Sequence, residues 1–396
     1  MPESILIVGG GFGGVQAALS LARKKIPDTQ IRFIDPKTYF EYHAALYRFA
    51  TGSSPMEACI PYKDIFENNG VEILQDTACT IDLSKKIVTG ASGSHYRFDT
   101  LILALGSVGA TFGIEGVSKY SYGMTSATEA LRLKMHILES FQTATIADVE
   151  NRKTLMHIVV VGGGPTGVEL AGELAFYART LALEHGLDPT LVCIDLVESA
   201  DKILGNLPER ASRIAEERLR TLGVSVLLNQ PLTREEIGKI QLKDKEILTA
   251  TVVWTAGVCA HPLIQKTVGI TVDRKGRATI DACLQANGYE NIFVIGDGAA
   301  TPYSGMAQTA LYDGDFVANV IECKTKNHAL PIYLPSVPLT AIPIGGEWAL
   351  YVKQGRIVTG YRGWMLRRFA DLQLFMKLLP FSKALRAFRC GYKLEG

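Results

Sequence analysis

Two glycine-rich turns contain the residues best suited to chemistry in this sequence. The first follows the apolar run ILIV and places Gly9, Gly11 and Gly14 in the GxGxxG pattern, with Gly13 in the same turn. The first glycine permits a tight turn, the second lets the backbone approach a pyrophosphate, and the third lets helix and strand pack closely. The following helix start adds partial positive charge, and Asp35, which ends the next strand-like run, can accept hydrogen bonds from an adenosine ribose. We therefore predict a dinucleotide site here.

The second turn repeats this device after the run HIVVV, with Gly162, Gly164 and Gly167 at the same spacing. Glu198, at the end of LVCIDLVE, is the candidate ribose acid. Asp195 competes for that role, because the spacing is looser than in the first copy. An acid at this place repels a 2′-phosphate, so the pattern favours NADH over NADPH. The chain thus contains an internal duplication of one nucleotide-binding unit.

Two dinucleotide sites in one chain predict an electron relay. One site would hold a resident FAD, and the other would admit a nicotinamide that passes a hydride to the flavin. Late in the chain, the run ENIFVIGD ends in Gly296 and Asp297. A carboxylate there can bind ribityl hydroxyls, or a magnesium ion or water on the pyrophosphate. A helix N-cap is the structural alternative for Asp297, and the two roles are compatible.

The elements that position these residues alternate between strand and helix, which is typical of an α/β fold with two Rossmann-like domains. Each unit closes with a similar strand and turn, and these turns contain Gly106 and Gly257. Because the ENIFVIGD strand comes so late, we expect the second domain to interrupt the first. The predicted parts are the FAD domain at 1–115 and 271–330, the NADH domain at 116–270, and C-terminal strands and amphipathic helices at 331–396.

Composition excludes several classes of protein. With 47% hydrophobic and 20% charged residues the chain is not disordered, and a formal net charge of +1 gives no reason to expect a nucleic-acid partner. Seven scattered cysteines without a CxxC pair argue against a disulfide framework or a zinc site, so no metal is predicted. The N-terminus has no secretory signal, and prolines interrupt the uncharged stretch at 329–346, so we expect neither export nor a transmembrane span.

The tail from Trp364 to Gly396 carries seven basic and two acidic residues. Its apolar residues recur near helical spacing, and Pro380 separates two pieces. A basic face opposite Trp, Phe and Leu is typical of a helix that lies in a membrane interface and is attracted to anionic headgroups. Packing into the core or into a dimer is the alternative interpretation.

These features resemble the two-dinucleotide flavoprotein disulfide reductases, without their redox CxxxxC pair. The segments YFEYHAALYRFATG, GGGPTGVELAGEL, MAQTAL and GEWALYVKQGRIVTGYRGWMLRR are more specifically similar to type II NADH:quinone oxidoreductases. The likeness spans almost the whole chain. It implies a peripheral respiratory enzyme, on the cytoplasmic face of the cell membrane, that passes a hydride from NADH to FAD and two electrons on to a membrane quinone without pumping protons. It also implies a homodimer.

The resemblance implies particular roles on the nucleotide side. Cys79 would contact adenine through its backbone, and Asp297 would lie near the ribityl chain. Glu169 would lie at the nicotinamide, where it couples protons or orients NADH, and a first-turn acid stabilised by the helix dipole is the alternative. The residues expected at FAD are Gly9, Gly11, Gly13, Gly14, Asp35, Cys79, Gly106, Gly296, Asp297, Ala307, Gln308 and Lys377. Those expected at NADH are Gly162, Gly164, Gly167, Glu169, Glu198 and Gly257.

On the quinone side, the family shows two glutamines in an AQxAxQ segment. Here the segment begins at Ala307 and Gln308 and places Tyr312 where the second glutamine belongs. Gln308 is therefore a candidate catalytic residue beside Glu169, and Tyr312 is expected to stack on or hydrogen-bond a quinone ring. Lys377 matches a family lysine that reaches the flavin or quinone, and a solvated or lipid-facing lysine is the alternative.

Three other functions remain open at this point. A sulfide:quinone oxidoreductase shares the architecture but relies on cysteines flanking the flavin. A soluble NADH-dependent reductase of a small redox protein would use the basic tail for docking. A nucleotide sensor would be reduced once and reoxidise slowly.

Overall fold

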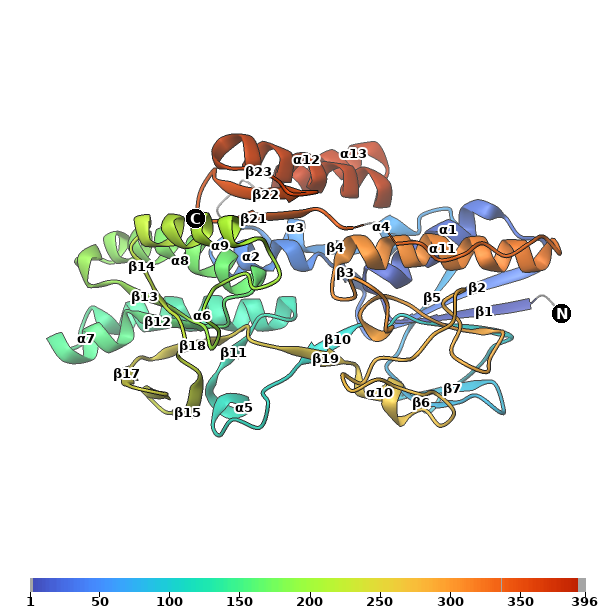
Figure 1. Cartoon of the computed structure of the whole chain (residues 1–396), viewed down its shortest axis with the longest axis horizontal. Helices are drawn as coiled ribbons and strands as arrows, with labels where there is room; N and C mark the ends of the chain where they lie inside the picture. Colours follow the sequence, from blue (N-terminus) through green and yellow to red (C-terminus); the bar gives the residue numbers. More distant parts are fainter. Residues whose placement is uncertain (1–2, 336, 391–396) are drawn as a thin grey trace.

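The computed structural model describes residues 3–335 and 337–390. Two sheet regions lie side by side along the long axis, and the C-terminal segment runs along one side of both (Figure 1). The predicted α/β fold with two Rossmann-like domains is confirmed, since each region is built on a parallel sheet of the same design.

The first sheet has the strand order β20-β9-β1-β2-β5, and all its pairs are parallel. Strands β1, β9 and β20 are short apolar runs that are almost wholly buried, as strands of a covered parallel sheet are, whereas the edge strand β5 is largely exposed. Helices α1 and α11 pack against each other beside it. The bounds are β1 Glu3–Val8, α1 Phe12–Lys24, β2 Thr29–Asp35, β5 Val71–Gln75, β9 Thr100–Leu103, β20 Ile292–Val294 and α11 Ala307–Thr325.

The second sheet repeats the arrangement as β11-β18-β12-β13-β14, again with parallel pairs only. In both sheets the strand before the glycine turn lies between the closing strand and the strand that carries the ribose acid. The bounds are β11 Tyr122–Gly123, α6 Ala127–Ala144, α7 Val149–Leu155, β12 His157–Val161, α8 Pro165–Glu184, β13 Cys193–Val197, α9 Glu209–Thr221, β14 Val224–Leu227 and β18 Thr251–Trp254.

An antiparallel pair of strands joins the two regions, because β10 (Ser107–Gly109) leaves the first sheet and β19 (Val258–Ala260) returns to it. Helix α10 (Pro262–Lys266) therefore already belongs to the first region. Its Leu263 and Ile264 pack with Leu101 in the core beneath the first sheet. The predicted NADH domain at 116–270 extends too far, because the chain turns back as soon as β18 ends.

Three small sheets and several short helices cover the ends of these cores. The sheets are β3 (Tyr39–Glu41) with β4 (Cys59–Pro61), β6 (Ala78–Asp82) with β7 (Ile87–Gly90) and β8 (His95–Arg97), and β15 (Leu232–Glu236) with β16 (Lys239–Leu242) and β17 (Glu246–Leu248). The short helices are α2 Leu46–Ala50, α3 Pro55–Ala58, α4 Tyr62–Ile65 and α5 Val117–Tyr120.

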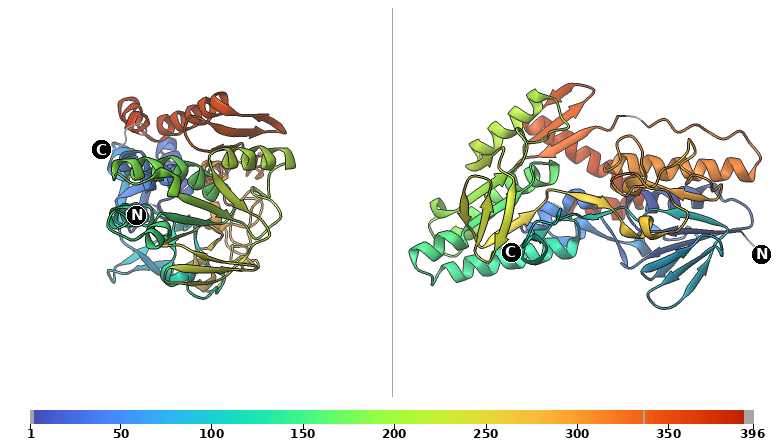
Figure 2. Two further views of the ribbon diagram at one scale, coloured as in Figure 1. Left: turned by 90° about the vertical axis from the view of Figure 1, so that its left-hand side faces the viewer. Right: turned by 60° about the horizontal axis from the view of Figure 1, so that its bottom comes forward.

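The C-terminal segment forms an antiparallel sheet followed by two helices (Figure 2). The bounds are β21 Thr340–Pro343, β22 Ala349–Lys353, β23 Arg356–Val358, α12 Gly360–Leu378 and α13 Phe381–Cys390. The predicted break at Pro380 is present. Lys393, counted among the basic tail residues, lies outside the described residues. Within the part of the chain that the structure describes, no helix is long and apolar enough to cross a membrane.

The prediction of a basic outer face on α12 is wrong, because two of its arginines are buried. Arg367 and Arg368 both bind the fully buried Asp371 one turn further along the helix. Arg368 also donates to Glu57 at 2.8 Å, and Arg48 donates to the same Glu57 at 2.6 Å. A buried ion cluster therefore joins α12 to α2 and α3. Truncating the tail would remove Arg368 from Glu57 and Asp371 from Arg48, which is strongly destabilising.

Candidate functional site

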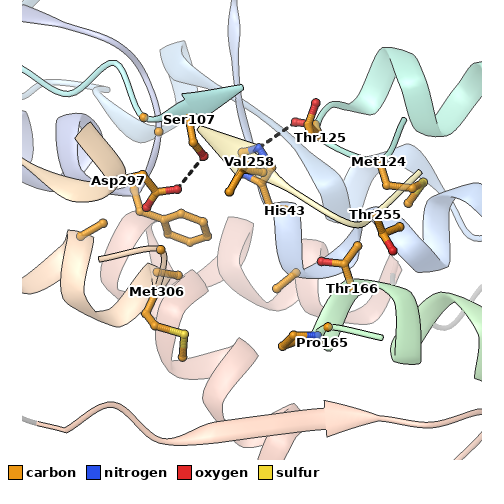
Figure 3. Close-up of a pocket in the computed structure, with 18 of the residues that line it drawn as sticks. His43, Ser107, Met124, Thr125, Pro165, Thr166, Thr255, Val258, Asp297 and Met306 are labelled. Atoms are coloured by element: carbon orange, nitrogen blue, oxygen red, sulfur yellow. Dashed lines mark hydrogen bonds between the residues drawn. The ribbon is translucent and has the colours of Figure 1, made fainter. Parts of the chain in front are cut away.

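A single large cavity, with a volume of about 1540 Å³, is lined by both glycine turns. It lies at the carboxyl ends of the two parallel sheets, which is where open α/β sheets bind ligands. Segments far apart in sequence meet around it: in Figure 3, Ser107 and Asp297 lie together on one side, and Pro165 and Thr166 at the start of α8 lie on another. Because ligand pockets usually measure roughly 300–1,000 Å³, this cavity has room for more than one ligand.

The first glycine turn has the shape that an FAD pyrophosphate needs. Gly9 has a φ of +107°, and a Cβ on Gly14 would overlap the carbonyl oxygen of Gly9. A Cβ on Gly11 would meet no atom within 4 Å, so this backbone faces open space at the start of α1. The turn thus presents the unpaired N–H groups of a helix start to the cavity, and its residues fit FAD.

Asp35 lies under this turn. Its Oδ2 accepts from the Gly10 N–H at 2.6 Å and its Oδ1 accepts from the Lys37 N–H at 2.9 Å. Burial raises the pKa of Asp35. The Tyr62 hydroxyl donates to the Gly10 carbonyl oxygen at 2.9 Å, and this buried hydrogen bond holds the turn in place. Sequence reasoning missed Tyr62, since nothing in its local pattern links it to the glycines.

The second turn is built in the same way, and its geometry decides between the two acids. Glu198 accepts from the Gly163 N–H at 2.6 Å and from the Ala200 N–H at 2.8 Å, and it lines the cavity. Asp195 lies in the middle of β13, outside the cavity lining, and pairs with His157. Glu198 is therefore the counterpart of Asp35.

The late Gly296–Asp297 segment is held over the cavity by a buried acid from α11. The Gly296 N–H donates to Asp313 at 2.9 Å, and the Tyr333 hydroxyl donates to the same carboxylate at 2.5 Å. Burial raises the pKa of Asp313 to about 6. Asp297 accepts from the Ser107 hydroxyl at 2.7 Å (Figure 3) and caps no helix, so the N-cap alternative is wrong. Asp313 and Tyr333 were not identified from the sequence.

Glu169 lines the cavity from the first turns of α8. Burial raises its pKa to about 8, and the positive charges of Arg367 and Arg48 oppose that rise without cancelling it. The side chain is therefore largely protonated at neutral pH. A neutral carboxyl facing a ligand cavity is a group that can hold and release a proton.

The residues expected at the quinone are only partly brought together. Ala307, Gln308 and Lys377 line the cavity. The Gln308 amide exchanges hydrogen bonds with the backbone of Leu339, and Lys377 donates to Asp315 at 2.9 Å. Tyr312 lies outside the cavity lining.

Tyr312 stacks on Phe316 and contacts Tyr333 on the outer side of α11, so it is not placed to touch a quinone in this cavity. The expected contact of the Cys79 backbone with adenine stays a prediction. Cys79 is exposed and outside the lining, while the preceding Thr77 and Ala78 line the cavity.

Comparisons with known proteins agree with this geometry. The sequence profile of the family described as pyridine nucleotide-disulphide oxidoreductase matches residues 3–314. A type II NADH:quinone oxidoreductase of Mycobacterium tuberculosis is 34% identical over 81% of this chain and 72% of its own length. This chain belongs to the type II NADH:quinone oxidoreductase family. The Staphylococcus aureus type II NADH:quinone oxidoreductase is 27% identical, over 96% of this chain and 98% of its own.

Solved structures share the fold. The structure of NDH2 from Plasmodium falciparum in complex with NADH superposes with a TM-score of 0.89 at 20% identity, over 99% of this chain and 98% of that one. The sulfide:quinone oxidoreductase of Aquifex aeolicus gives a TM-score of 0.80 at 19% identity, and the match covers 96% of this chain and 92% of that one. In the part of this chain that the structure describes, no cysteine lines the cavity. The cavity therefore lacks the thiols that a sulfide:quinone oxidoreductase uses beside its flavin.

Proposed function

We propose that this protein oxidises NADH and reduces a membrane quinone through a bound FAD. The observation that carries the proposal is one cavity lined by both glycine turns, in a member of the type II NADH:quinone oxidoreductase family. FAD, when bound, accepts two electrons from a nicotinamide and releases them to a quinone. No protein nucleophile is needed, so the chain acts by position and electrostatics.

Each side of the cavity has its own task in this proposal. Gly11 and Asp35 hold the FAD pyrophosphate and ribose, and Asp297 holds the ribityl chain. Gly164 and Glu198 hold the corresponding parts of NADH, and the Glu198 carboxylate excludes a 2′-phosphate. The nicotinamide is thereby directed from the second sheet toward the flavin of the first, in a cavity narrowed by the β10 and β19 strands.

Glu169 is proposed to carry protons. Reduction of a quinone to a quinol consumes two electrons and two protons, and a carboxyl that is protonated at neutral pH can supply one of them. A pKa of about 8, set by burial, supports this role over that of a fixed anion. Arg367, which also lines the cavity, links Glu169 to the buried ion cluster.

An anaerobic absorbance titration tests the overall function. NADH is expected to bleach the flavin in a one-to-one ratio, and one addition of a short-chain quinone is expected to restore the colour at once. Bleaching without recovery would point to a protein acceptor or a sensor. No bleaching would mean that the second glycine turn does not bind NADH.

Membrane attachment is proposed to use the outer face of α12 rather than its arginines. This face exposes Phe369 at 58% and Met365 at 50%, whereas Arg367, Arg368 and Asp371 of the same helix are buried. Further exposed apolar residues extend the patch, namely Tyr361, Leu366, Met376 and Phe381. Ala370, Gln373 and Leu374 on the same helix line the cavity, so a lipid-dissolved quinone would have a short path to it. The cytoplasmic face and the homodimer stay predictions.

A Phe369→Glu, Met365→Glu double variant is expected to lose at least about nine-tenths of its binding to phosphatidylcholine–phosphatidylglycerol vesicles, because inserting charge opposes apolar burial. Vesicle sedimentation measures this loss. Flavin reduction by NADH should be unchanged, since both side chains lie outside the cavity lining. An Ile146→Glu, Val149→Glu variant is the matched control, because both residues are exposed and apolar and lie just before α7 and at its first position. Equal sedimentation of both variants would contradict this docking face.

A further inference from the structure

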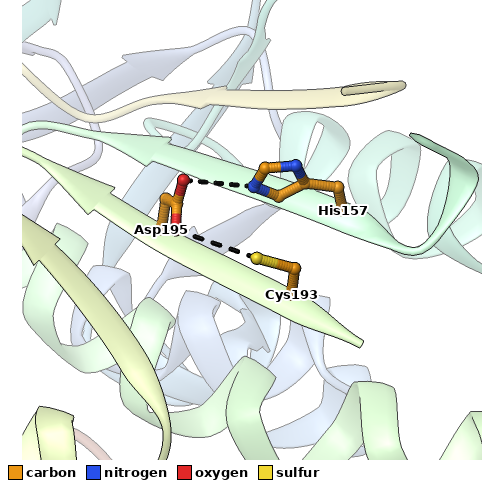
Figure 4. A group of neighbouring side chains, drawn as sticks. All are labelled: His157, Cys193 and Asp195. Carbon is orange, nitrogen blue, oxygen red and sulfur yellow. Dashed lines mark hydrogen bonds and ion pairs between the residues drawn. The ribbon is translucent and has the colours of Figure 1, made fainter. Parts of the chain in front are cut away.

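The amino ends of β12 and β13 hold three side chains that the nucleotide chemistry does not use. His157 opens β12, while Cys193 opens β13 and is followed two residues later by Asp195. His157 and Cys193 are register partners in this parallel pair. Because side chains alternate along a strand, Cys193 and Asp195 share one face. The three side chains converge on one point, as Figure 4 shows.

Their spacing is close to that of ligands around one metal ion. His157 Nε2 lies 3.2 Å from Asp195 Oδ2, and Cys193 Sγ lies 3.9 Å from Asp195 Oδ1. One ligand atom from each residue lies within 4.8 Å of the other two. Ligand atoms bound to a tetrahedral Zn²⁺ at about 2.0–2.3 Å are roughly 3.5 Å from one another. Small side-chain rotations would therefore bring all three atoms onto one ion.

The imidazole is also oriented as in a metal site. Its other nitrogen, Nδ1, lies 2.9 Å from the carbonyl oxygen of Leu248 in β17. A histidine that binds a metal almost always donates its second ring N–H to such an acceptor, which directs the remaining nitrogen at the ion. Here the nitrogen so directed is Nε2, which faces Asp195.

We propose that His157, Cys193 and Asp195 bind one Zn²⁺ ion. Imidazole, thiolate and carboxylate are its usual ligands, and the thiolate and carboxylate together balance its charge. His157 and Cys193 are only partly buried, so a water molecule can take the fourth position. Gly162 and Glu198 follow the opposite ends of the same strands, five residues from His157 and Cys193. At about 3.3 Å per residue they lie about 16 Å away. The ion would clamp two strands and take no part in hydride transfer.

This assignment differs from the expectation drawn from the cysteines alone. The absence of a CxxC pair argues against sites built within one segment, but here the ligands come from two strands that are distant in sequence. Only the register of β12 against β13 places His157 beside Cys193.

Calorimetric titration of Zn²⁺ into the FAD-loaded full chain, freed of metal with EDTA, tests the proposal. We expect one Zn²⁺ per chain, with a Kd at least about tenfold weaker in Cys193→Ser, because one of three ligands is lost. Cys283→Ser removes a comparable, partly buried thiol elsewhere and should bind like the unchanged protein. NADH oxidation should be the same in all three proteins.

Co²⁺ provides a second readout that does not depend on affinity. The unchanged protein and Cys283→Ser should show a thiolate-to-cobalt charge-transfer band in the near ultraviolet, which Cys193→Ser should lack. If Cys193→Ser does not fold, the cobalt band of the unchanged protein and its loss in His157→Gln decide the question. No Zn²⁺ bound by the unchanged protein, or equal binding by Cys193→Ser, would overturn the proposal. Neither outcome bears on NADH:quinone turnover, which is tested separately.

Discussion

A Gly167→Ala variant is expected to purify with its flavin and yet show no bleaching at NADH concentrations that fully reduce the unchanged protein. The added methyl group would overlap the carbonyl oxygen of Gly162 and lie 2.7 Å from the Thr255 hydroxyl oxygen. The start of α8 would have to move away from the turn that holds the NADH pyrophosphate. A misplacement of about 1 Å can cost roughly 10²-fold, so we expect the apparent Kd for NADH to rise by at least about that factor.

The duplicated design supplies the matching variant for this experiment. A Cβ on Gly14 would overlap the Gly9 carbonyl oxygen in the same way, so Gly14→Ala should lose FAD itself. Gly109→Ala is the control, because its nearest neighbour, a methyl carbon of Thr125, is 3.8 Å away. Dithionite should still reduce the flavin of Gly167→Ala. Normal bleaching of this variant by NADH would contradict the assignment of the second turn.

A Glu169→Gln variant is expected to lose about 10² in quinone-dependent turnover, while NADH reduces its flavin within about threefold of the normal rate. Positioned acids and bases typically contribute 10²–10⁴. With a pKa raised to about 8, the carboxyl is protonated below that pH and becomes an anion above it. Turnover of the unchanged protein should therefore fall as pH rises through about 8. The glutamine variant should lack that step, which stopped-flow and steady-state rates across pH would measure.

Glu173→Gln is the matched control for this second experiment. Glu173 lies one turn further along α8, also has a pKa raised by burial, and does not line the cavity. Glu173→Gln should reduce its flavin with NADH and turn over with quinone at the normal rates, and its turnover should still fall as the pH rises through about 8. If Glu169→Gln slows flavin reduction as much as turnover, Glu169 orients NADH instead. If turnover of Glu169→Gln depends on pH in the same way as that of the unchanged protein, Glu169 has no role in proton transfer.

Parts of the site followed from the sequence because they depend on local backbone geometry. Gly9 and Gly162 adopt positive φ values, and Gly14 and Gly167 leave no room for a Cβ, so each turn must carry glycine at fixed spacing. The strand before each turn and the helix after it have clear apolar patterns. The family resemblance added Glu169, which the structure places on the cavity.

Other parts could not be predicted because they depend on contacts between distant segments. The choice of Glu198 over Asp195 required the distance to Gly163, which no spacing rule supplies. Asp313 supports Gly296 from α11, and nothing in the local sequence of that helix links the two residues. Tyr312 follows Gln308 by one helical turn, yet it contacts Tyr333 instead of the cavity.

The sequence by itself determined the two nucleotide-binding units, their order and the presence of two C-terminal helices, because steric limits at glycine and the periodicity of apolar residues act over a few residues. Only the tertiary structure decided which side of α12 is buried. Periodicity places arginines on the outer face, whereas the acids Glu57 and Asp371 make burial of Arg367 and Arg368 favourable. The pairs with Asp371 of the same helix and with Glu57 of α3 hold these arginines inside the protein, while Met365 and Phe369 are exposed.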